Sequence, residues 1–239
     1  IGIFQVALDD NQIKAIWFAR GGYGSIQLAS LINWSNFAEN PKWLIGFSDV
    51  TVWHSLLQQQ GFMSLHAAMP STFNDTESQA INKAVDLLKG EVFKLEVENH
   101  PFNFLEKEIS GVLWGGNLSI IVSMLGSIDF HHCENGILCI EDVGEYLYHI
   151  DRMMYQLRRS KILEKSKALL VGGFSEMNDN STPFGENAYE IIKRHAHELR
   201  LPVVFDAPFG HIRKNYPLIF GLNVNLNRNQ DRVVLQELS

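Results

Sequence analysis

The feature that most constrains this chain is the rapid alternation of strand-forming and helix-forming segments in its first third. Ile13–Ala19 is an apolar, β-rich run that ends at a glycine-rich loop, and Ser25–Ile32 then carries apolar residues at helical spacing. Trp43–Phe47 repeats the strand pattern, and Thr51–Gln59 follows as a second expected helix. Alternation at this pace is typical of a parallel sheet with helices on its faces. We therefore expect an α/β fold whose N-terminal part is a parallel-sheet domain.

The pattern changes in the second part of the chain. Thr76–Lys89 has the periodicity of an amphipathic helix, and Gly90–Phe104 is a polar, proline-interrupted connection. Beyond it we expect strands at Gly111–Trp114, Ile137–Ile140, Ala168–Gly172 and Val203–Asp206, and helices at Leu118–Leu125, Ile150–Leu157 and Glu186–Leu199. The sequence predicts two domains: an N-terminal α/β domain with its linker over residues 1–97, and a C-terminal mixed α/β domain over residues 98–239.

Composition and charge exclude several classes of protein. Hydrophobic residues make up 46% of the chain and charged residues 20%, which excludes a disordered chain or a coiled coil. The formal charge of −7 is the opposite of what a nucleic-acid backbone binder carries, and the apolar runs are too short to cross a bilayer. Cys133 and Cys139 are the only cysteines, and neither belongs to a CxxC motif. A reducing compartment is the simplest interpretation, so we expect a cytoplasmic protein that binds neither nucleic acid nor membrane.

A serine between an expected strand and an expected helix is the first candidate for chemistry. Ser48 follows Trp43–Phe47, and Gly46 lies two residues before it. In a nucleophile elbow, such a turn lifts the serine out of the sheet, and the next backbone N–H helps to bind an oxyanion. The second glycine of the GxSxG motif is absent here. The local pattern alone favours a structural alternative, in which Ser48 or Asp49 caps the helix.

The glycine-rich loop Arg20–Gly24 (RGGYG) is the second candidate. Glycines after a strand let backbone N–H groups approach an anion, and the helix that follows adds a partial positive charge. The loop matches neither GxGxxG nor GxxxxGKS, so a nucleotide site has weak support. A loop that binds an oxyanion or a carboxylate fits the same physics equally well. A tight turn that requires positive φ is the structural alternative.

Acidic residues and one histidine complete the candidates. Glu141, Asp142 and Glu145 follow an apolar strand, and Glu141 is expected to be the first residue beyond it. Such a cluster can be a metal site, a general base or a solvated loop. His211 is the most suggestive of the nine histidines because it follows the apolar run Val203–Phe205 and adjoins a glycine. A lone histidine is nevertheless more often structural than catalytic.

Together these segments resemble the LD-carboxypeptidase family, the muramoyl-tetrapeptide carboxypeptidases, which are serine peptidases. The motifs occur in order as Ile13–Gly24 (IKAIWFARGGYG), Ile45–Thr51 (IGFSDVT), Leu113–Asn117 (LWGGN), Ile140–Glu145 with Ile150–Arg152 (IEDVGE and IDR), and Phe209–His211 (FGH) before Gly221-Leu222. Each motif alone is weakly specific, whereas the ordered series is a strong signal.

The resemblance implies a catalytic triad and a reaction. By it, Ser48 is the nucleophile, Glu141 the triad acid and His211 the base, and the site lies in a cleft between the two domains. It implies removal of the terminal D-alanine from a murein tetrapeptide or muropeptide, in cell-wall recycling. It also implies a homodimer, and a reaction that requires no cofactor and no metal.

Further roles follow from the resemblance and from the loops. We expect the backbone N–H groups of Gly22 and Asp49 to form the oxyanion hole. Arg20 is the candidate for binding the free carboxylate of the substrate, although a structural ion pair is equally possible. His66 and Trp114 are expected on family grounds to line the cleft, and packing is the alternative for both.

Two departures and three alternatives remain open from the sequence. Residues 67–69 (AAM) stand where relatives usually carry Gly-Pro-Met. We also expect the opening strand–helix units before Ile13 to be missing and residues 1–12 to match the family poorly. One alternative is a self-immunity hydrolase that cleaves aminoacyl- or peptidyl-nucleotide antibiotics. A second is a non-catalytic protein that binds wall peptides, and a third is a nucleotide-binding module built on the glycine-rich loop. The continuation GEYLYHIDR favours the murein branch.

Overall fold

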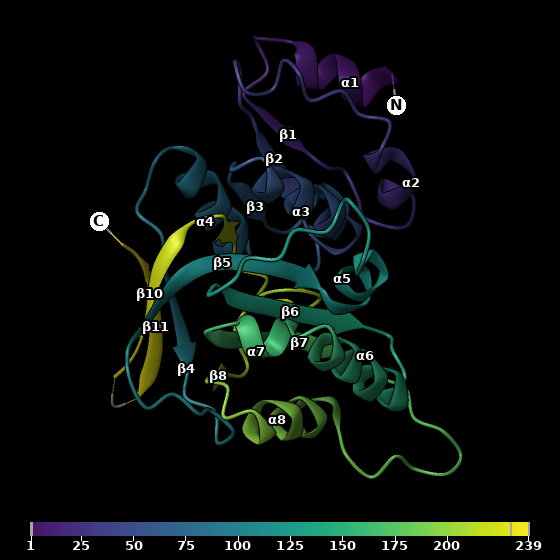
Figure 1. Ribbon diagram of the computed structural model, residues 1–239. Coiled ribbons are helices and arrows are strands. Elements are labelled where there is room, and N and C mark those ends of the chain that lie inside the picture. Colours follow the sequence, from purple (N-terminus) through teal and green to yellow (C-terminus); the bar gives the residue numbers. More distant parts are fainter. Residues whose placement is uncertain (1, 230, 239) are drawn as a thin grey trace.

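Two β-sheets organise the chain (Figure 1). The computed structural model describes residues 2–229 and 231–238. The smaller sheet has four strands in the order β1-β2-β3-β9, and the larger has seven in the order β4-β11-β10-β5-β6-β7-β8. The combination of a parallel sheet and a mixed sheet confirms the predicted α/β class. Across the described residues, no helix is both long enough and apolar enough to span a membrane.

The smaller sheet is parallel over its first three strands, as the sequence predicts. These are β1 (Ala15–Trp17), β2 (Trp43–Gly46) and β3 (Ser64–His66). The fourth strand, β9 (Leu218–Phe220), comes from the C-terminal part of the chain and runs antiparallel to β3. The N-terminal sheet is therefore completed by a strand that lies far away in the sequence.

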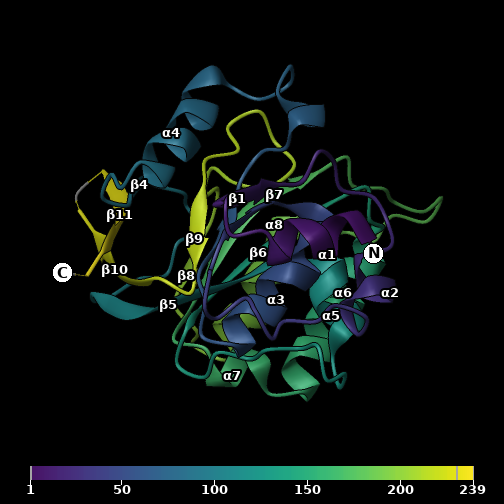
Figure 2. The same cartoon turned by 90° about the horizontal axis from the view of Figure 1, so that it is seen from above.

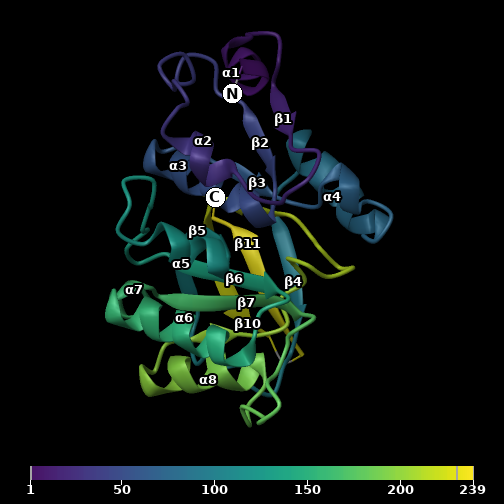
Figure 3. The ribbon, with the colours of Figure 1, turned by 90° about the vertical axis from the view of Figure 1, so that its right-hand side faces the viewer.

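Helices cover both faces of the smaller sheet. They are α1 (Gly2–Asp9), α2 (Ser25–Ala29), α3 (Thr51–Gln59) and α4 (Ser78–Leu88), with 3₁₀ turns η1 (Ser48–Val50) and η2 (Pro70–Thr72). Figures 2 and 3 show α4 on the opposite side of this sheet from α2 and α3. The bounds of α3 agree with the sequence prediction, because Gly61 and the polar residues before it end the apolar periodicity.

The larger sheet is parallel at one end and antiparallel at the other. Its strands are β4 (Lys94–Glu98), β5 (Ile109–Asn117), β6 (Ile137–Val143), β7 (Ala168–Ser175), β8 (Val203–Val204), β10 (Asn223–Arg228) and β11 (Arg232–Glu237). Strands β5 to β8 are parallel, whereas β10, β11 and β4 pair antiparallel. The helices α5 (Leu118–Met124), α6 (Leu147–Arg159), α7 (Ile162–Lys165) and α8 (Ala188–Glu198) gather along the parallel end (Figure 3).

Two sequence expectations about the larger sheet were wrong. The segment predicted as a polar connection contains β4, in which Leu95 and Val97 are buried while Lys94, Glu96 and Glu98 are exposed. This is the alternation of a strand with one solvated face, and its charged residues conceal it. Strand β6 continues as far as Val143, so Glu141 lies inside the strand rather than beyond its end.

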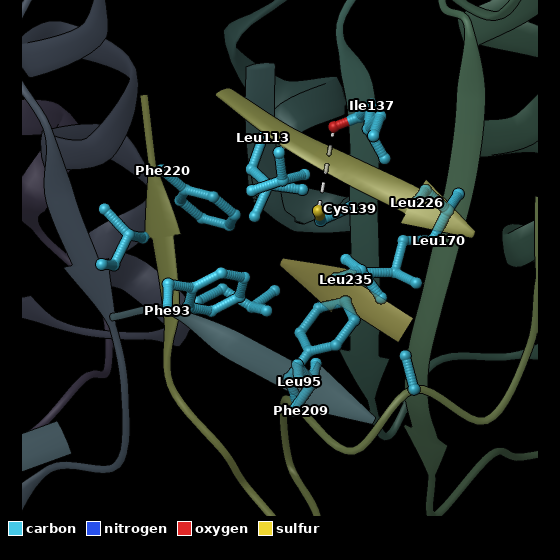
Figure 4. Packing of buried hydrophobic residues seen from close by; sticks show 14 of the residues in the cluster. Phe93, Leu95, Leu113, Ile137, Cys139, Leu170, Phe209, Phe220, Leu226 and Leu235 are labelled. Atoms are coloured by element: carbon cyan, nitrogen blue, oxygen red, sulfur yellow. Dashed lines mark hydrogen bonds between the residues drawn. The ribbon is translucent and has the colours of Figure 1, made fainter. Parts of the chain in front are cut away.

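A shared hydrophobic core joins the two sheets. Figure 4 shows Phe220 of β9 and Phe93 beside Leu113 and Cys139 of the larger sheet, all in one buried cluster. Ile45 of β2 belongs to the same cluster. Because interiors of this kind pack at crystal-like density, the strands that carry the candidate residues are held in a fixed mutual position. The predicted domain boundary between residues 97 and 98 stays a prediction.

Candidate active site

Ser48 lies at a strained turn between β2 and α3. Its φ angle is 62°, which is the left-handed region that a non-glycine residue rarely adopts. At Gly46, a Cβ atom would come within 2.8 Å of Val50 Cγ2, so the strand end passes this turn too closely for any side chain. Backbone strain of this kind costs about 1–3 kcal/mol and concentrates at functional sites. The turn has the strand-to-helix form predicted from the sequence.

The helix-capping alternative for this serine does not hold. The residues at the cap positions of η1 and α3 are Phe47 and Val50, and neither helix has a side-chain cap hydrogen bond. Asp49 instead accepts a hydrogen bond of 3.0 Å from the backbone N–H of Ser25, the first residue of α2. The aspartate thus fastens the end of the glycine-rich loop to the serine turn.

The glycine-rich loop lies directly against Ser48. At Gly21, a Cβ atom would be 3.2 Å from Ser48 Cβ and 3.3 Å from Ser48 Oγ. Gly22 has a φ angle of 129°, which only glycine adopts readily. The Arg20 Nε–H donates to the Gly21 carbonyl at 3.2 Å. Loop backbone, guanidinium and serine hydroxyl therefore occupy one small region.

Glu141 of β6 and His211, which follows β8, form a hydrogen-bonded pair. Glu141 Oε2 accepts from His211 Nδ1 at 2.6 Å and from the backbone N–H of His211 at 3.2 Å. The Glu141 side chain is fully buried, whereas that of His211 is 20% exposed. Gly210 permits the contact, because a Cβ atom there would lie 2.6 Å from Glu141 Cβ. The partners are 70 positions apart in the sequence and come together because β6, β7 and β8 lie side by side.

The charge of Glu141 controls the ionisation of His211. Burial by itself lowers the pKa of the imidazole, but the negative charge of Glu141 and its hydrogen bond outweigh that effect. The pKa of His211 is therefore raised above 6.5. An imidazole held in this way accepts a proton readily and keeps one tautomer, with its proton on Nδ1.

Asp142, the next residue, faces different partners. It accepts 2.9 Å hydrogen bonds from Asn117 Nδ2 and from the backbone N–H of Ser119. Burial and the nearby charge of Glu141 raise the pKa of Asp142 to about 6. Asp142 thereby joins β6 to the first turn of α5. The solvated-loop alternative for this acidic segment is wrong, since both carboxylates lie buried in β6.

The third acidic residue of the segment lies apart from this pair. Glu145 forms an ion pair with His149 on α6. Within residues 2–229 and 231–238, no group of three or more histidine, cysteine, aspartate or glutamate side chains is arranged to hold a metal ion.

The two halves of the candidate site face one pocket of about 330 Å³. Its lining residues are Arg20, Gly21, Gly22, Phe47, Ser48, Met69, Ser71, Thr72 and His211. The Phe47 and His211 rings are 4.7 Å apart between centroids, which places the imidazole beside the residue that precedes Ser48. Ser48 and His211 thus share a cavity without a direct hydrogen bond between them. Such contacts are often long in a free enzyme and shorten when substrate binds.

The structure places two predicted cleft residues elsewhere. His66 is fully buried, and both of its ring nitrogens lack a hydrogen-bond partner among the described residues. Burial holds the pKa of His66 well below 6.5. Trp114 is 2% exposed and lines a separate cavity that includes Thr51. The packing alternative describes both side chains in this structure, and a role in substrate binding stays a prediction.

Four further pocket residues were not among the predicted site residues, although Phe47 lies within the Ile45–Thr51 motif. Phe47, Met69, Ser71 and Thr72 line the pocket beside the serine. The backbone N–H of Ser71 donates to the carbonyl of Ala19 at 3.0 Å, so the segment after β3 closes the pocket by contacting the end of β1. The one sequence signal next to this segment was the departure of residues 67–69 from the family's usual Gly-Pro-Met.

Comparison with known proteins places the chain among carboxypeptidases. The LD-carboxypeptidase N-terminal domain matches residues 2–67, and the LD-carboxypeptidase C-terminal domain matches residues 110–226. A putative carboxypeptidase of Synechocystis is 35% identical over 219 residues, which cover 91% of this chain and 71% of that relative. The murein tetrapeptide carboxypeptidase of Pseudomonas aeruginosa is 28% identical over 238 residues, covering 95% and 76%. The chain belongs to the LD-carboxypeptidase family.

Solved structures agree with this assignment. The crystal structure of muramoyltetrapeptide carboxypeptidase from Oxalobacter formigenes has a TM-score of 0.89 and 28% identity, over 99% of this chain and 82% of that one. The microcin C7 self-immunity protein MccF shares the fold with a TM-score of 0.81 at 17% identity, over 98% and 79%. The expectation that residues 1–12 match the family poorly was wrong, because the N-terminal match begins at residue 2.

Proposed function

We propose that this protein is a serine-type LD-carboxypeptidase that removes the terminal D-alanine from murein tetrapeptides. One observation carries the proposal. A buried carboxylate, Glu141, holds His211 at the edge of the pocket that also contains the strained Ser48. Serine, histidine and a carboxylate recur on unrelated folds as a catalytic triad, which is recognised by geometry and roles rather than by sequence spacing. The resemblance noted in the sequence assigns the same residues.

In the proposed reaction, His211 removes the proton from Ser48 Oγ while the oxygen attacks the carbonyl carbon of the final peptide bond. The imidazolium then delivers that proton to the amine of the leaving D-alanine. Water, deprotonated by the same imidazole, hydrolyses the acyl-serine ester. Glu141 holds the Nδ1–H tautomer and stabilises the imidazolium, in keeping with the raised pKa of His211.

Two further groups of residues complete the proposal. The backbone N–H groups of Gly22 and Asp49 are the proposed oxyanion hole, and each donor of this type is worth about 3–4 kcal/mol in the transition state. Arg20 is proposed to bind the terminal carboxylate. Among the described residues, no carboxylate forms an ion pair with Arg20, and its backbone adjoins Gly21 in the pocket wall. His66 and Trp114 do not line this pocket, so they would affect the substrate only through the residues that do.

The cellular setting belongs to the proposal as well. The two cysteines are free thiols, Cys133 half-buried and Cys139 buried, which suits a reducing cytoplasm. We propose that the protein works there in murein recycling as a homodimer, that its substrate is a murein tetrapeptide or muropeptide, and that it binds neither nucleic acid nor membrane.

The proposal is tested by mass spectrometry of the tetrapeptide L-Ala–γ-D-Glu–meso-diaminopimelate–D-Ala after incubation with protein. The parent protein is expected to release D-alanine, whereas folded Ser48→Ala and His211→Ala variants release none above background. If the folded parent binds the tetrapeptide and leaves it intact, the protein is a wall-peptide binding protein. If it instead hydrolyses a peptidyl-nucleotide, the self-immunity function replaces this one.

A further inference from the structure

The motif Leu113–Asn117 (LWGGN) has no part in the proposed reaction, yet it lies beside the acid of the candidate triad. It forms the end of β5. In the parallel pairing of β5 with β6, Asn117 is the register partner of Glu141. An element that binds Asn117 is thereby placed relative to Glu141.

Helix α3, which begins three residues after Ser48, packs against this strand. Two buried side chains of the helix form hydrogen bonds to the backbone of the motif. Thr51 Oγ1 accepts from the backbone N–H of Asn117 at 3.0 Å, and Gln58 Nε2 donates to the carbonyl of Leu113 at 2.8 Å. The helix that follows the serine turn is therefore fastened to both ends of the motif.

The contact at Thr51 depends on a glycine in the motif. Gly116 has a φ angle of 134°, and a Cβ atom there would lie 2.4 Å from Thr51 Oγ1. Any side chain at this position would push β5 away from the hydroxyl. On the other side, the backbone N–H of Thr51 donates to the carbonyl of Ser48. Because Thr51 and Asn117 are both buried, loss of the hydroxyl would leave the Asn117 N–H without a partner.

The side chain of Asn117 continues the connection toward the acid. Its Oδ1 accepts from the hydroxyl of Ser119 at 2.7 Å and from the backbone N–H of Ile120 at 3.2 Å. Its Nδ2 donates to Asp142 Oδ1 at 2.9 Å, and Asp142 adjoins Glu141 in β6. A continuous path, which we call the Thr51–Asn117–Asp142 link, thus joins the serine turn to the strand of the acid.

Ser48 and His211 depend on their surroundings for alignment, because they share a pocket without bonding to each other. We infer that Thr51 is a positioning residue: through Asn117 it holds the serine turn at a fixed distance from the acid–base pair. The inference rests on the proposed function and adds to it a residue that acts only through others. A displacement of about 1 Å between reacting groups can lower a rate by about 100-fold.

The test measures hydrolysis of the murein tetrapeptide by Thr51→Val, in which a methyl group of similar size replaces the hydroxyl. We expect kcat to fall by about 10- to 100-fold, because the serine turn is no longer held in place. KM should stay within about twofold, because the residues that line the pocket are unchanged. The acid limb of the pH profile should not move, since the hydrogen bond between Glu141 and His211 is intact. Thr51→Ser, which keeps the hydroxyl, should restore most of kcat.

Ser55→Ala is the matched control. Ser55 lies one turn further along α3, and its hydroxyl also bonds two backbone groups outside the helix, the Asp129 carbonyl and the His131 N–H, at 2.8 Å each. These groups lie outside the Thr51–Asn117–Asp142 link. Ser55→Ala should therefore lower stability and leave kcat unchanged.

Three results would overturn the inference. They are an unchanged kcat in Thr51→Val, an equal loss of kcat in Ser55→Ala, and a shifted acid limb in Thr51→Val, which would mean that the substitution acts on the ionisation of His211. If Thr51→Val does not fold, Thr51→Ala takes its place, because it puts no additional methyl group against Gly116.

A double-mutant cycle in urea separates this inference from the proposed function, because it requires no substrate. Thr51→Val and Asp142→Asn act on the two ends of the Thr51–Asn117–Asp142 link, so their losses of unfolding free energy should not add. Losses in Ser55→Ala and Asp142→Asn should add. A non-additive cycle supports the link even if the parent hydrolyses no tetrapeptide. Additive losses for Thr51 and Asp142 contradict it whatever the parent hydrolyses.

Discussion

The two sheets contribute to the candidate site by different physical means. The smaller sheet places Ser48 through backbone conformation: this left-handed residue lies two positions after Gly46, which ends β2 and leaves no room for a side chain. The larger sheet places Glu141 and His211 through burial and hydrogen bonds. The serine is thus defined by its immediate neighbours in sequence. The acid–base pair exists only after several strands have assembled, so the two parts should respond differently to substitution.

The largest expected effect is the separation of activity from stability at Ser48. Ser48→Gly should lower kcat by roughly 10⁴- to 10⁶-fold, because the nucleophile is lost. It should also raise the free energy of unfolding by up to about 1 kcal/mol, because glycine accepts a φ angle of 62° without strain. Urea denaturation and D-alanine release measure the two quantities. Ser48→Ala, which keeps a Cβ, is the matched variant and should gain no stability.

The next effect concerns the acid–base pair. Glu141→Gln should lower kcat by about 10³- to 10⁴-fold, since the imidazole loses its fixed tautomer and the charge that stabilises its protonated form.

The pH profile of kcat/KM tests the cause of that loss. In the parent, activity should fall as pH drops through the pKa of His211, which is raised above 6.5, because protonation removes the base. In Glu141→Gln this acid limb should move to lower pH, because burial then acts on the imidazole without the opposing carboxylate. Asp142→Asn is the comparison: it weakens the contacts to Asn117 and Ser119 and should lower stability, and it should move the limb in the same direction but by less, because Asp142 raises the pKa of His211 less than Glu141 does. An unmoved limb in Glu141→Gln would contradict the assigned pair.

Two glycines make the comparison between the sheets direct. Gly210→Ala would bring a Cβ within 2.6 Å of Glu141 Cβ at a φ angle of 98°, and should lower the free energy of unfolding by about 3 kcal/mol. Gly21→Ala adds a Cβ 3.2 Å from Ser48 Cβ with no unfavourable φ, and should change stability by less than about 1 kcal/mol. Thermal and urea unfolding of both variants measure the difference. Equal loss of stability in the two variants would contradict the difference drawn here between the buried Glu141–His211 pair and the turn at Ser48.

The smallest expected effect is on the pH dependence of stability and comes from His54, which packs beneath the turn at Ser48. His54 contacts the Gly46 carbonyl through Nε2 at 3.0 Å and Ser64 Oγ through Nδ1 at 2.8 Å. Burial, partly opposed by the hydrogen bond to Gly46, lowers the pKa of His54 from 6.5 to about 4.

The sign of the effect on stability follows from proton binding. His54 takes up a proton near pH 6.5 in the unfolded chain but only near pH 4 in the folded protein. The stability that neutral, buried His54 contributes is therefore fully present above pH 6.5 and is lost as pH falls toward 4. The free energy of unfolding should fall by about 2 kcal/mol more in the parent than in His54→Gln over this range. Parallel slopes in the two proteins would show that His54 does not titrate in this way.

The difference between the two sheets also explains which parts of the structure could be predicted from the sequence. Ser48 and the loop around Gly22 could be located because a short motif dictates a local turn, and α3 followed from periodicity. Glu141 was misplaced beyond the end of its strand, because the charged residues at the end of β6 conceal that it continues to Val143. Strand β4 was missed for the same reason, and β9 because pairing with a distant strand leaves no local pattern.

The side chains of the pocket were harder still to predict. His66 and Trp114 came from the resemblance, which does not say whether a side chain points into a cavity or into the core. Ser71 and Thr72 line the pocket where the segment after β3 contacts Ala19 through a backbone hydrogen bond. Contacts of this kind depend on assembled tertiary structure and leave no periodic trace in the sequence.

The central claim is that Ser48 acts as a nucleophile activated by the pair in the larger sheet. The most direct test uses the tetrapeptide with D-lactate in place of D-alanine, because an ester acylates a serine quickly and leaves hydrolysis of the acyl-enzyme as the slow step. Acid-quenched protein should gain the mass of the acyl tripeptide, located by peptide mapping on Ser48 and absent from Ser48→Ala. Release of D-lactate by both proteins, with no adduct on Ser48, would contradict the account.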